Sequence, residues 1–96
     1  MYQRKDIERK LIQLRPTLTD RFNVSKIGYF GSYYTGKQTE KSDLDLLVEF
    51  SKPTGWDFFT LEEFLEKEFG LRIDLVTMDG LKERMRTPIL SQVQYI

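Results

Sequence analysis

The stretch FGSYYTGKQTEKSDLDLLVEF, residues 30–50, carries a glycine–serine pair that is followed, after ten residues, by an Asp-Leu-Asp triplet. Its second part, LDLLVEF, residues 44–50, is apolar and rich in β-forming side chains, which predicts a strand. Successive side chains of a strand point to opposite faces, so Asp43 and Asp45 should share one face, about 6.6 Å apart. Two carboxylates on one face can bind a single cation, although aspartates are also common at solvated strand ends.

The pair Gly31-Ser32 directly follows a short apolar segment, KIGYF, residues 26–30, which we expect to be a buried strand. Glycine lets the backbone turn sharply and lets a ligand approach it closely. If a helix begins at this turn, its free N–H groups and the Ser32 hydroxyl face the same way and suit phosphate oxygens. An ordinary turn is the alternative, because Gly-Ser pairs usually mark turns.

A third acidic residue, Asp74, is set inside the apolar stretch LRIDLVTM, residues 71–78, which predicts another strand. Burying an unpaired carboxylate is costly, so the position needs an explanation. A structural salt bridge to Arg72 or Arg21 is one. The other is that this strand neighbours residues 44–50, which would bring Asp74 to the face of the first two aspartates.

Three carboxylates gathered in this way would repel one another by roughly 3 kcal/mol per pair at a separation of about 5 Å. A small domain cannot spare that much of its stability. A divalent cation or a shared proton must relieve the repulsion. With oxygen ligands only, the pattern favours Mg²⁺ carried in with a nucleotide, since protein side chains alone seldom hold this ion.

The hydrophobic pattern as a whole predicts a single α/β domain over residues 1–96, a small mixed sheet with helices on at least one face. Pro16 should either break the first helix or begin a short second helix or bent continuation, which Asn23 ends. Gly70 is a natural helix cap, and Pro88 should interrupt the last helix. The expected elements are a helix (4–15), a strand (26–30), a strand (44–50), a helix (57–69), a strand (71–78) and a helix (81–85).

Composition excludes several kinds of site. The chain has no cysteine and no histidine, so disulfides, thiolate metal sites and histidine-based catalysis are impossible. Fifteen basic residues balance fifteen acidic ones, whereas a protein that binds nucleic acid directly is normally basic. No apolar run approaches the length of a membrane span, and the N-terminus does not look like a signal peptide. We therefore expect a cytoplasmic protein that binds neither membranes nor nucleic acid.

Gly31-Ser32, ten residues, and then Asp43-Leu44-Asp45 resemble the nucleotidyltransferase signature of the DNA polymerase β superfamily. The likeness extends further, because residues 30–50 and the segment RIDLVTMDGLKERMRTPIL, residues 72–90, are similar to the small minimal nucleotidyltransferases (MNT). Those proteins resemble the antitoxin half of HEPN/MNT toxin–antitoxin pairs. The resemblance covers the whole chain and implies a fold like the palm domain of polymerase β.

The same resemblance implies a role for each motif residue. Asp43 and Asp45 would ligate Mg²⁺, and Asp74 would complete a second metal site and help to deprotonate the attacking hydroxyl. Gly31 and Ser32 would hold the β- and γ-phosphates of ATP. AMP would then pass to a tyrosine of the HEPN RNase toxin as pyrophosphate leaves, with two Mg²⁺ ions stabilising the attacking and leaving oxygens.

The chain departs from the family pattern at Tyr34 and Thr35, where many relatives have a small residue and an arginine. A phosphate-facing or structural arginine is therefore missing. Lys37 is one candidate replacement, although a loop lysine is more often simply solvated. We assign both Lys37 and Ser42 to the expected nucleotide site.

Two other functions stay open beside the enzyme. One is an MNT subunit that neutralises its HEPN partner by binding, with weak or no catalysis. The other, a nucleic-acid polymerase domain, is disfavoured because the chain is neutral and has no room for a template-binding domain. The aromatic content favours a protein partner, in a homo- or hetero-oligomer, since aromatics are enriched at interfaces. The aromatic side chains in question are Tyr29, Tyr33, Tyr34, Trp56, Phe58 and Phe59.

Overall fold

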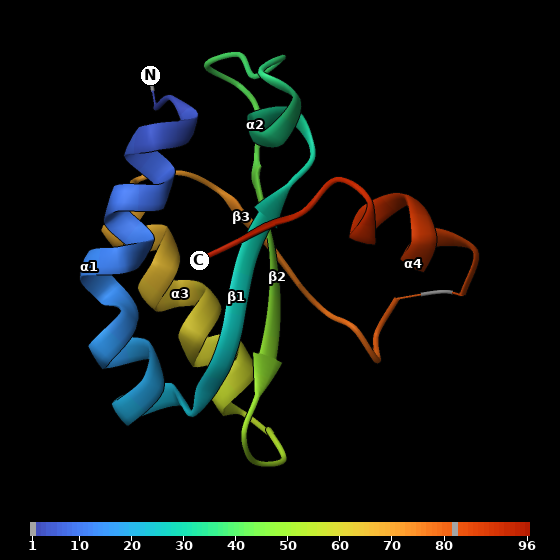
Figure 1. Ribbon diagram of the computed structural model, residues 1–96. Helices are drawn as coiled ribbons and strands as arrows, with labels where there is room; N and C mark the ends of the chain where they lie inside the picture. Colours follow the sequence, from blue (N-terminus) through green and yellow to red (C-terminus); the bar gives the residue numbers. More distant parts are fainter. Residues whose placement is uncertain (1, 82) are drawn as a thin grey trace.

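The computed structural model describes residues 2–81 and 83–96 and contains a mixed sheet (Figure 1). Within these residues the sheet has four strands in the order β3-β2-β1-β4. The two central strands, β1 and β2, are antiparallel, whereas β2 and β3 are parallel. The fourth strand is short and pairs antiparallel with β1. The strands are β1 (Val24–Phe30), β2 (Leu44–Phe50), β3 (Ile73–Thr77) and β4 (Gln94–Tyr95).

Two long helices, α1 (Arg4–Phe22) and α3 (Asp57–Phe69), lie together against one face of the sheet (Figure 1). A single turn of helix, α2 (Ser32–Thr35), follows β1 directly. The last helix, α4 (Glu83–Leu90), lies on the other side of the sheet from α1 and α3. The α/β class and the mixed sheet predicted from the sequence are both confirmed.

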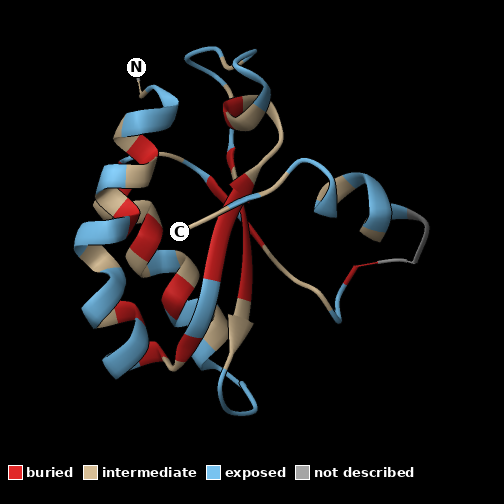
Figure 2. Cartoon of the chain, in the orientation of Figure 1, coloured by how far each residue is buried: buried red, intermediate tan, exposed pale blue. Residues whose placement is uncertain are grey.

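The hydrophobic core lies between the sheet and the two long helices. Buried residues concentrate on the strands and on the sides of α1 and α3 that face them (Figure 2). On β2, Leu44, Leu46 and Val48 are fully buried in this core, which leaves Asp45 on the opposite face, as the strand alternation predicts. The core therefore fixes which face of the sheet carries the acidic side chains.

The first helix differs from the sequence prediction, because α1 runs through Pro16 without a break and ends at Phe22. Proline removes one backbone donor and crowds the preceding turn. Here Leu11 and Leu18, on either side of the proline, are buried in the core and hold the helix against the sheet. Asn23 ends the helix in a left-handed conformation with φ of 58°, as expected.

The other boundaries were predicted with mixed success. β2, α3 and the capping role of Gly70 match, whereas β1 begins two residues earlier and β3 is shorter than expected. The last helix was predicted over residues 81–85 and ending before Pro88, which is wrong: α4 runs from Glu83 to Leu90 with Pro88 inside it, and Lys82 lies outside the described residues. The sequence analysis did not predict α2 or β4 as elements.

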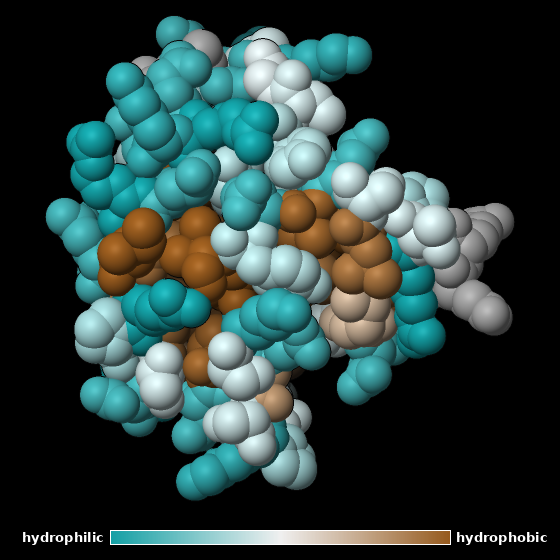
Figure 3. All heavy atoms as spheres, in the orientation of Figure 1, coloured by the Kyte–Doolittle hydropathy of each residue, from teal (hydrophilic) through white to brown (hydrophobic). Residues whose placement is uncertain are grey.

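The aromatic side chains divide between core and surface. Tyr29 and Tyr33 are buried, whereas Trp56 is 84% exposed and Phe59 is 56% exposed. Figure 3 shows apolar side chains reaching the surface in the middle of one face, framed by hydrophilic ones. None of the described helices is long and apolar enough to cross a membrane.

Candidate active site

Asp45 and Asp74 are direct neighbours across the parallel pair β2–β3, where they are register partners. Each is the second residue of its strand, and the pairing begins with the Leu44 N–H donating to the Arg72 carbonyl at 2.9 Å. Residues paired in this way have side chains on the same face of the sheet. The predicted meeting of these two carboxylates is therefore confirmed.

The apolar residues around Asp74 in the sequence suggested a buried carboxylate. The structure shows that Asp74 is exposed, so the cost of burying an unpaired charge does not arise. Its neighbours Ile73 and Leu75 fill the core, while its own side chain lies on the face away from α1 and α3. Arg21, one of the two suggested salt-bridge partners, instead stacks on Phe22, 4.9 Å from its ring centroid. The carboxylate of Asp74 is therefore accessible to a ligand.

The turn after β1 packs directly on Asp45. Gly31 has φ of 72° and ψ of −145°, a conformation that is essentially restricted to glycine. A Cβ built on Gly31 would overlap the Oδ2 atom of Asp45. Phe30, the residue before this glycine, is the register partner of Asp45 on the other neighbouring strand. Two separate constraints, backbone conformation and space, therefore require glycine at this position.

Ser32 begins α2, so a helix does start at the glycine turn. The Tyr34 and Thr35 N–H groups both donate to the Gly31 carbonyl at 3.0 Å, and Gly36 closes the turn through a left-handed conformation. The first N–H groups of a helix have no partner within it and can bind an anion. The start of α2 thus follows directly on Gly31, which lies against Asp45, so its backbone donors are close to the acidic pair.

The electrostatics of the acidic group centre on Asp45. Burial, the neighbouring Asp74 and a lesser contribution from Asp43 raise the pKa of Asp45 from 3.8 to about 6. A hydrogen-bonding contact with Asp74 also contributes to the raised pKa of Asp45. Asp43 precedes β2 and is exposed at the margin. A bound cation would relieve the repulsion that raises this pKa.

A model of the nucleotidyltransferase domain matches residues 11–96 of the chain, which include every acidic and glycine–serine residue described above. The chain belongs to the nucleotidyltransferase family. The protein adenylyltransferase MntA of Thermococcus cleftensis is 42% identical over 93 residues, 96% of this chain and 94% of that protein. A protein of Methanocaldococcus jannaschii assigned the same activity is 43% identical over 79 residues, 81% of this chain and 78% of that one.

Solved structures agree with this membership. A structure assigned as a minimal nucleotidyltransferase matches with a TM-score of 0.81 and 30% identity, and the match covers 97% of this chain and 95% of that one. A toxin–antitoxin structure with AMP-PNP shares the fold, with a TM-score of 0.74 and 24% identity over 92% of this chain and 70% of that one. The fold of this nucleotidyltransferase is therefore that of the minimal members of the family.

The residues of the nucleotidyltransferase site have the donor atoms that Mg²⁺ prefers, since carboxylate oxygens are hard ligands. After burial, the carboxylates of Asp74 and Asp43 contribute to the raised pKa of Asp45, and a cation would neutralise the negative charge that they add. In the described part of the chain, no group of three or more acidic side chains is close enough to form a complete metal cluster. The phosphates of a nucleotide would therefore have to supply ligands as well.

Lys37 and Ser42 are less directly placed than the other predicted residues. The Lys37 side chain is exposed, and its backbone N–H donates to the Ser32 carbonyl at the end of α2. The Ser42 hydroxyl accepts a hydrogen bond from the Thr39 N–H at 2.9 Å and so closes the loop before β2. Ser42 therefore shapes the loop that delivers Asp43, and its nucleotide-binding role stays a prediction.

A cluster of side chains that was not predicted from the sequence connects α1 to the turn after β1. Tyr29 is fully buried, and its hydroxyl donates to Glu8 at 2.9 Å and accepts from the Arg4 Nε at 3.1 Å. The Arg4 guanidinium lies 4.8 Å from the centroid of the Tyr34 ring on α2. An arginine from α1 thus contacts α2, which lacks the arginine of the family motif. The spacing of Arg4 and Glu8, one turn apart, was the available signal.

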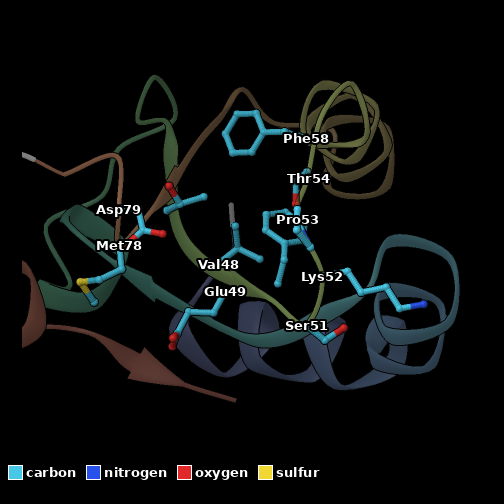
Figure 4. Close-up of a pocket in the computed structure, with 11 residues that line it drawn as sticks. Val48, Glu49, Ser51, Lys52, Pro53, Thr54, Phe58, Met78 and Asp79 are labelled. Carbon is cyan, nitrogen blue, oxygen red and sulfur yellow. The ribbon is translucent and has the colours of Figure 1, made fainter.

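A cavity of about 660 Å³ lies at the other end of β2 and β3 (Figure 4). Its walls are the end of β2 with the following loop, Val48–Thr54, together with Phe58 on α3 and the segment 77–79. Neither Asp45 nor Gly31 is among the described residues that line it. The cavity is therefore separate from the acidic pair, which lies at the start of β2 and β3.

Proposed function

We propose that this nucleotidyltransferase is a Mg²⁺-dependent protein adenylyltransferase that transfers AMP from ATP to a tyrosine hydroxyl of a HEPN-domain toxin, and thereby acts as an antitoxin. The observation that carries the proposal is the register of Asp45 with Asp74 beside the Gly31 turn. Relatives named as protein adenylyltransferases support AMP as the transferred group. A HEPN toxin in complex with an MNT antitoxin, whose fold is similar, supports the choice of partner.

The proposed roles follow the placement of the side chains. Asp43 and Asp45 would hold Mg²⁺, with Asp74 completing a second metal position. Bound Mg²⁺ would neutralise the charge that develops on the phosphates during transfer. Gly31 and Ser32 would bind the β- and γ-phosphates through backbone N–H groups and the serine hydroxyl, and Lys37 and Ser42 would contribute from the loop that follows.

In the proposed reaction the acceptor hydroxyl attacks the α-phosphorus of ATP. A bond forms between that oxygen and the α-phosphorus, and the bond from the α-phosphorus to the bridging oxygen of the β-phosphate breaks. The hydroxyl proton passes to Asp74, which is exposed and so accessible to the acceptor. Pyrophosphate leaves from the side of Ser32. No water takes part in the transfer, so the active site has to place the acceptor hydroxyl in line with the leaving group.

Substituting asparagine for Asp43 or Asp45 tests the assignment. Each change keeps the shape of the side chain and removes the charge, so transfer should fall below detection while the fold persists. Incubation with a purified HEPN partner, ATP and Mg²⁺, followed by intact-mass measurement, should show added AMP units with the native chain only. Full incorporation by both variants would show that these carboxylates are not catalytic. A tight complex with no mass change would favour neutralisation by binding alone.

The Ser32→Ala variant tests the phosphate site separately. Loss of the hydroxyl should weaken ATP binding, by about tenfold, if it donates to a charged phosphate oxygen. Ser32 caps no other element with its side chain, so the unfolding temperature should change little. Titration calorimetry with ATP and Mg²⁺ measures the dissociation constant. An unchanged dissociation constant would show that Ser32 does not bind the nucleotide.

A further inference from the structure

Asp74 is carried by β3, which has β2 on one side and is the last strand of the sheet on the other. The backbone groups of alternate residues point to opposite edges of a strand. The Arg72 carbonyl bonds to Leu44 on β2, so the N–H groups of Ile73 and Leu75 point to the outer edge. An edge strand with free donors of this kind is only held from one side.

Two glutamates of α3 reach those outward N–H groups. The Glu66 Oε2 accepts a hydrogen bond from the Ile73 N–H at 3.2 Å. The Glu62 carboxylate lies near the Leu75 N–H, which opposes the rise in the pKa of Glu62. Both side chains are half-buried. Because Ile73 and Leu75 are the residues on either side of Asp74, Glu66 holds the backbone before this aspartate and Glu62 lies beside the backbone after it.

The spacing of the two glutamates matches the spacing of the strand. Residues four apart on a helix are about 6 Å apart along its axis, and alternate residues of a strand are about 6.6 Å apart. The chain reverses at Gly70, so α3 and β3 run in opposite directions, and the later glutamate meets the earlier strand residue. One face of α3 therefore lies along the edge strand, where Glu66 binds Ile73 and Glu62 is near Leu75.

We propose that Glu62 and Glu66 are positioning residues that hold Asp74 in register with Asp45 for AMP transfer. The inference rests on the proposed function for its kinetic consequence, although the hydrogen bonds stand without it. Misplacing a reacting group by about 1 Å can slow a reaction about a hundredfold. An edge strand that slides or opens would move Asp74 by that much.

The two glutamates also place negative charge near the site. Burial, Glu66 and Asp74 together raise the pKa of Glu62 above its ordinary value. Packing of α3 on the sheet does not by itself require carboxylates next to an acidic site. Their oxygens can accept hydrogen bonds from the outward N–H groups of β3, which explains why acidic residues occupy these positions. Glutamine keeps an oxygen acceptor without the charge, so it separates the hydrogen bond from the charge.

Steady-state kinetics of transfer test the positioning role, with the partner protein and ATP both varied. Glu62→Ala and Glu66→Ala should each lower kcat by about tenfold or more and leave the KM for ATP within about twofold. Glu62→Gln and Glu66→Gln should retain most of the native kcat. The control is Glu63→Ala, which changes an exposed acid on the same helix. A native kcat in the double alanine variant, or equal losses in the glutamine and alanine variants, would overturn the proposal.

Amide hydrogen exchange of the native chain provides a second readout that needs no activity. The Ile73 and Leu75 amides should exchange slowly although they lie on a sheet edge, and each should exchange at least about tenfold faster in the alanine variant of its own glutamate. Fast exchange at both amides in the native chain would show that the glutamates do not protect them, and the proposal would fail. If Asp45→Asn also kept full activity, the proposed function would fail, whereas the exchange result would stand by itself.

Discussion

At the scale of single residues, the charge on Asp45 sets how the stability of the metal-free protein depends on pH. The folded pKa of about 6 exceeds the ordinary value of 3.8, so the folded state holds a proton that the unfolded state gives up between these values. Stability from this group is therefore fully present below about pH 4 and is lost as the pH rises through 6. The metal-free site is consequently strained at neutral pH.

The Asp45→Asn variant should therefore be more stable than the native chain at pH 7 and not at pH 4. The full shift corresponds to ~3 kcal/mol, and because Asp45 is only half-buried, we expect about 1 kcal/mol after allowing for screening by solvent. Urea unfolding at several pH values, with a chelator present, measures the difference. A difference between the two proteins that stayed constant from pH 4 to pH 7 would contradict the raised pKa.

Gly31 offers a second residue-scale prediction with a matched control. Gly31→Ala combines a strained backbone with a collision against the Asp45 carboxylate and should cost at least about 2 kcal/mol of stability together with nearly all activity. Gly36→Ala also has a positive φ, of 79°, but its Cβ meets nothing within 4 Å, so it should cost only about 1 kcal/mol. Thermal unfolding and the transfer assay should separate the two variants. Equal effects would mean that contact with Asp45 is unimportant.

At the scale of elements, Pro16 is the clearest weakness of α1. The proline is exposed within the helix and lacks the N–H that would bond to the carbonyl four residues earlier. Pro16→Ala should restore that bond and stabilise the protein by about 1–2 kcal/mol, which is less than the full helix penalty because the unfolded chain also becomes more flexible. Urea unfolding measures the change, and the transfer activity should be unaffected. Destabilisation would show that the proline relieves strain where α1 meets the sheet.

The elements that could be predicted from the sequence are those with a long and regular hydrophobic pattern. β2 and α3 repeat apolar residues over seven and thirteen residues, and their bounds were predicted correctly. The single turn α2 and the two-residue β4 are too short to carry a period. Pro16 and Pro88 were expected to interrupt helices, but both lie inside one. In α1, packing of the helix on the core outweighs the preference of proline for the first turn of a helix.

At the scale of the whole molecule, the candidate site joins three elements that are distant in the sequence. Side-chain alternation predicted a shared face for Asp43 and Asp45, but Asp43 lies just before β2, so that part stays a prediction, whereas the pairing of β2 with β3 brings Asp74 to Asp45. The contact between Gly31 and Asp45 could not be predicted, because it depends on the register of β1 with β2. The hydrogen bonds of Glu62 and Glu66 were missed for the same reason: local spacing cannot show which strand lies at the edge of a sheet.

Because the acidic site strains the metal-free fold, nucleotide and metal together should stabilise the whole molecule. A ligand at a hundred times its dissociation constant adds about 2.7 kcal/mol, which corresponds to a rise in Tm of about 11–22 °C for a domain of this size. ATP with Mg²⁺ should produce this shift at pH 7, and ATP with a chelator should not. The shift reports binding alone and requires no partner protein.

The same shift should shrink at acid pH, because a cation has to displace the proton from Asp45. One unit below the pKa of about 6, most molecules carry that proton, so binding at pH 5 should be about tenfold weaker and the rise in Tm correspondingly smaller. ATP itself also gains protons in this range, so its affinity for Mg²⁺ is measured without protein at both pH values and sets the loss that ATP alone would cause. The native chain should lose more stabilisation between pH 7 and pH 5 than this loss predicts. A loss no larger than that caused by ATP alone would show that Asp45 does not hold the cation.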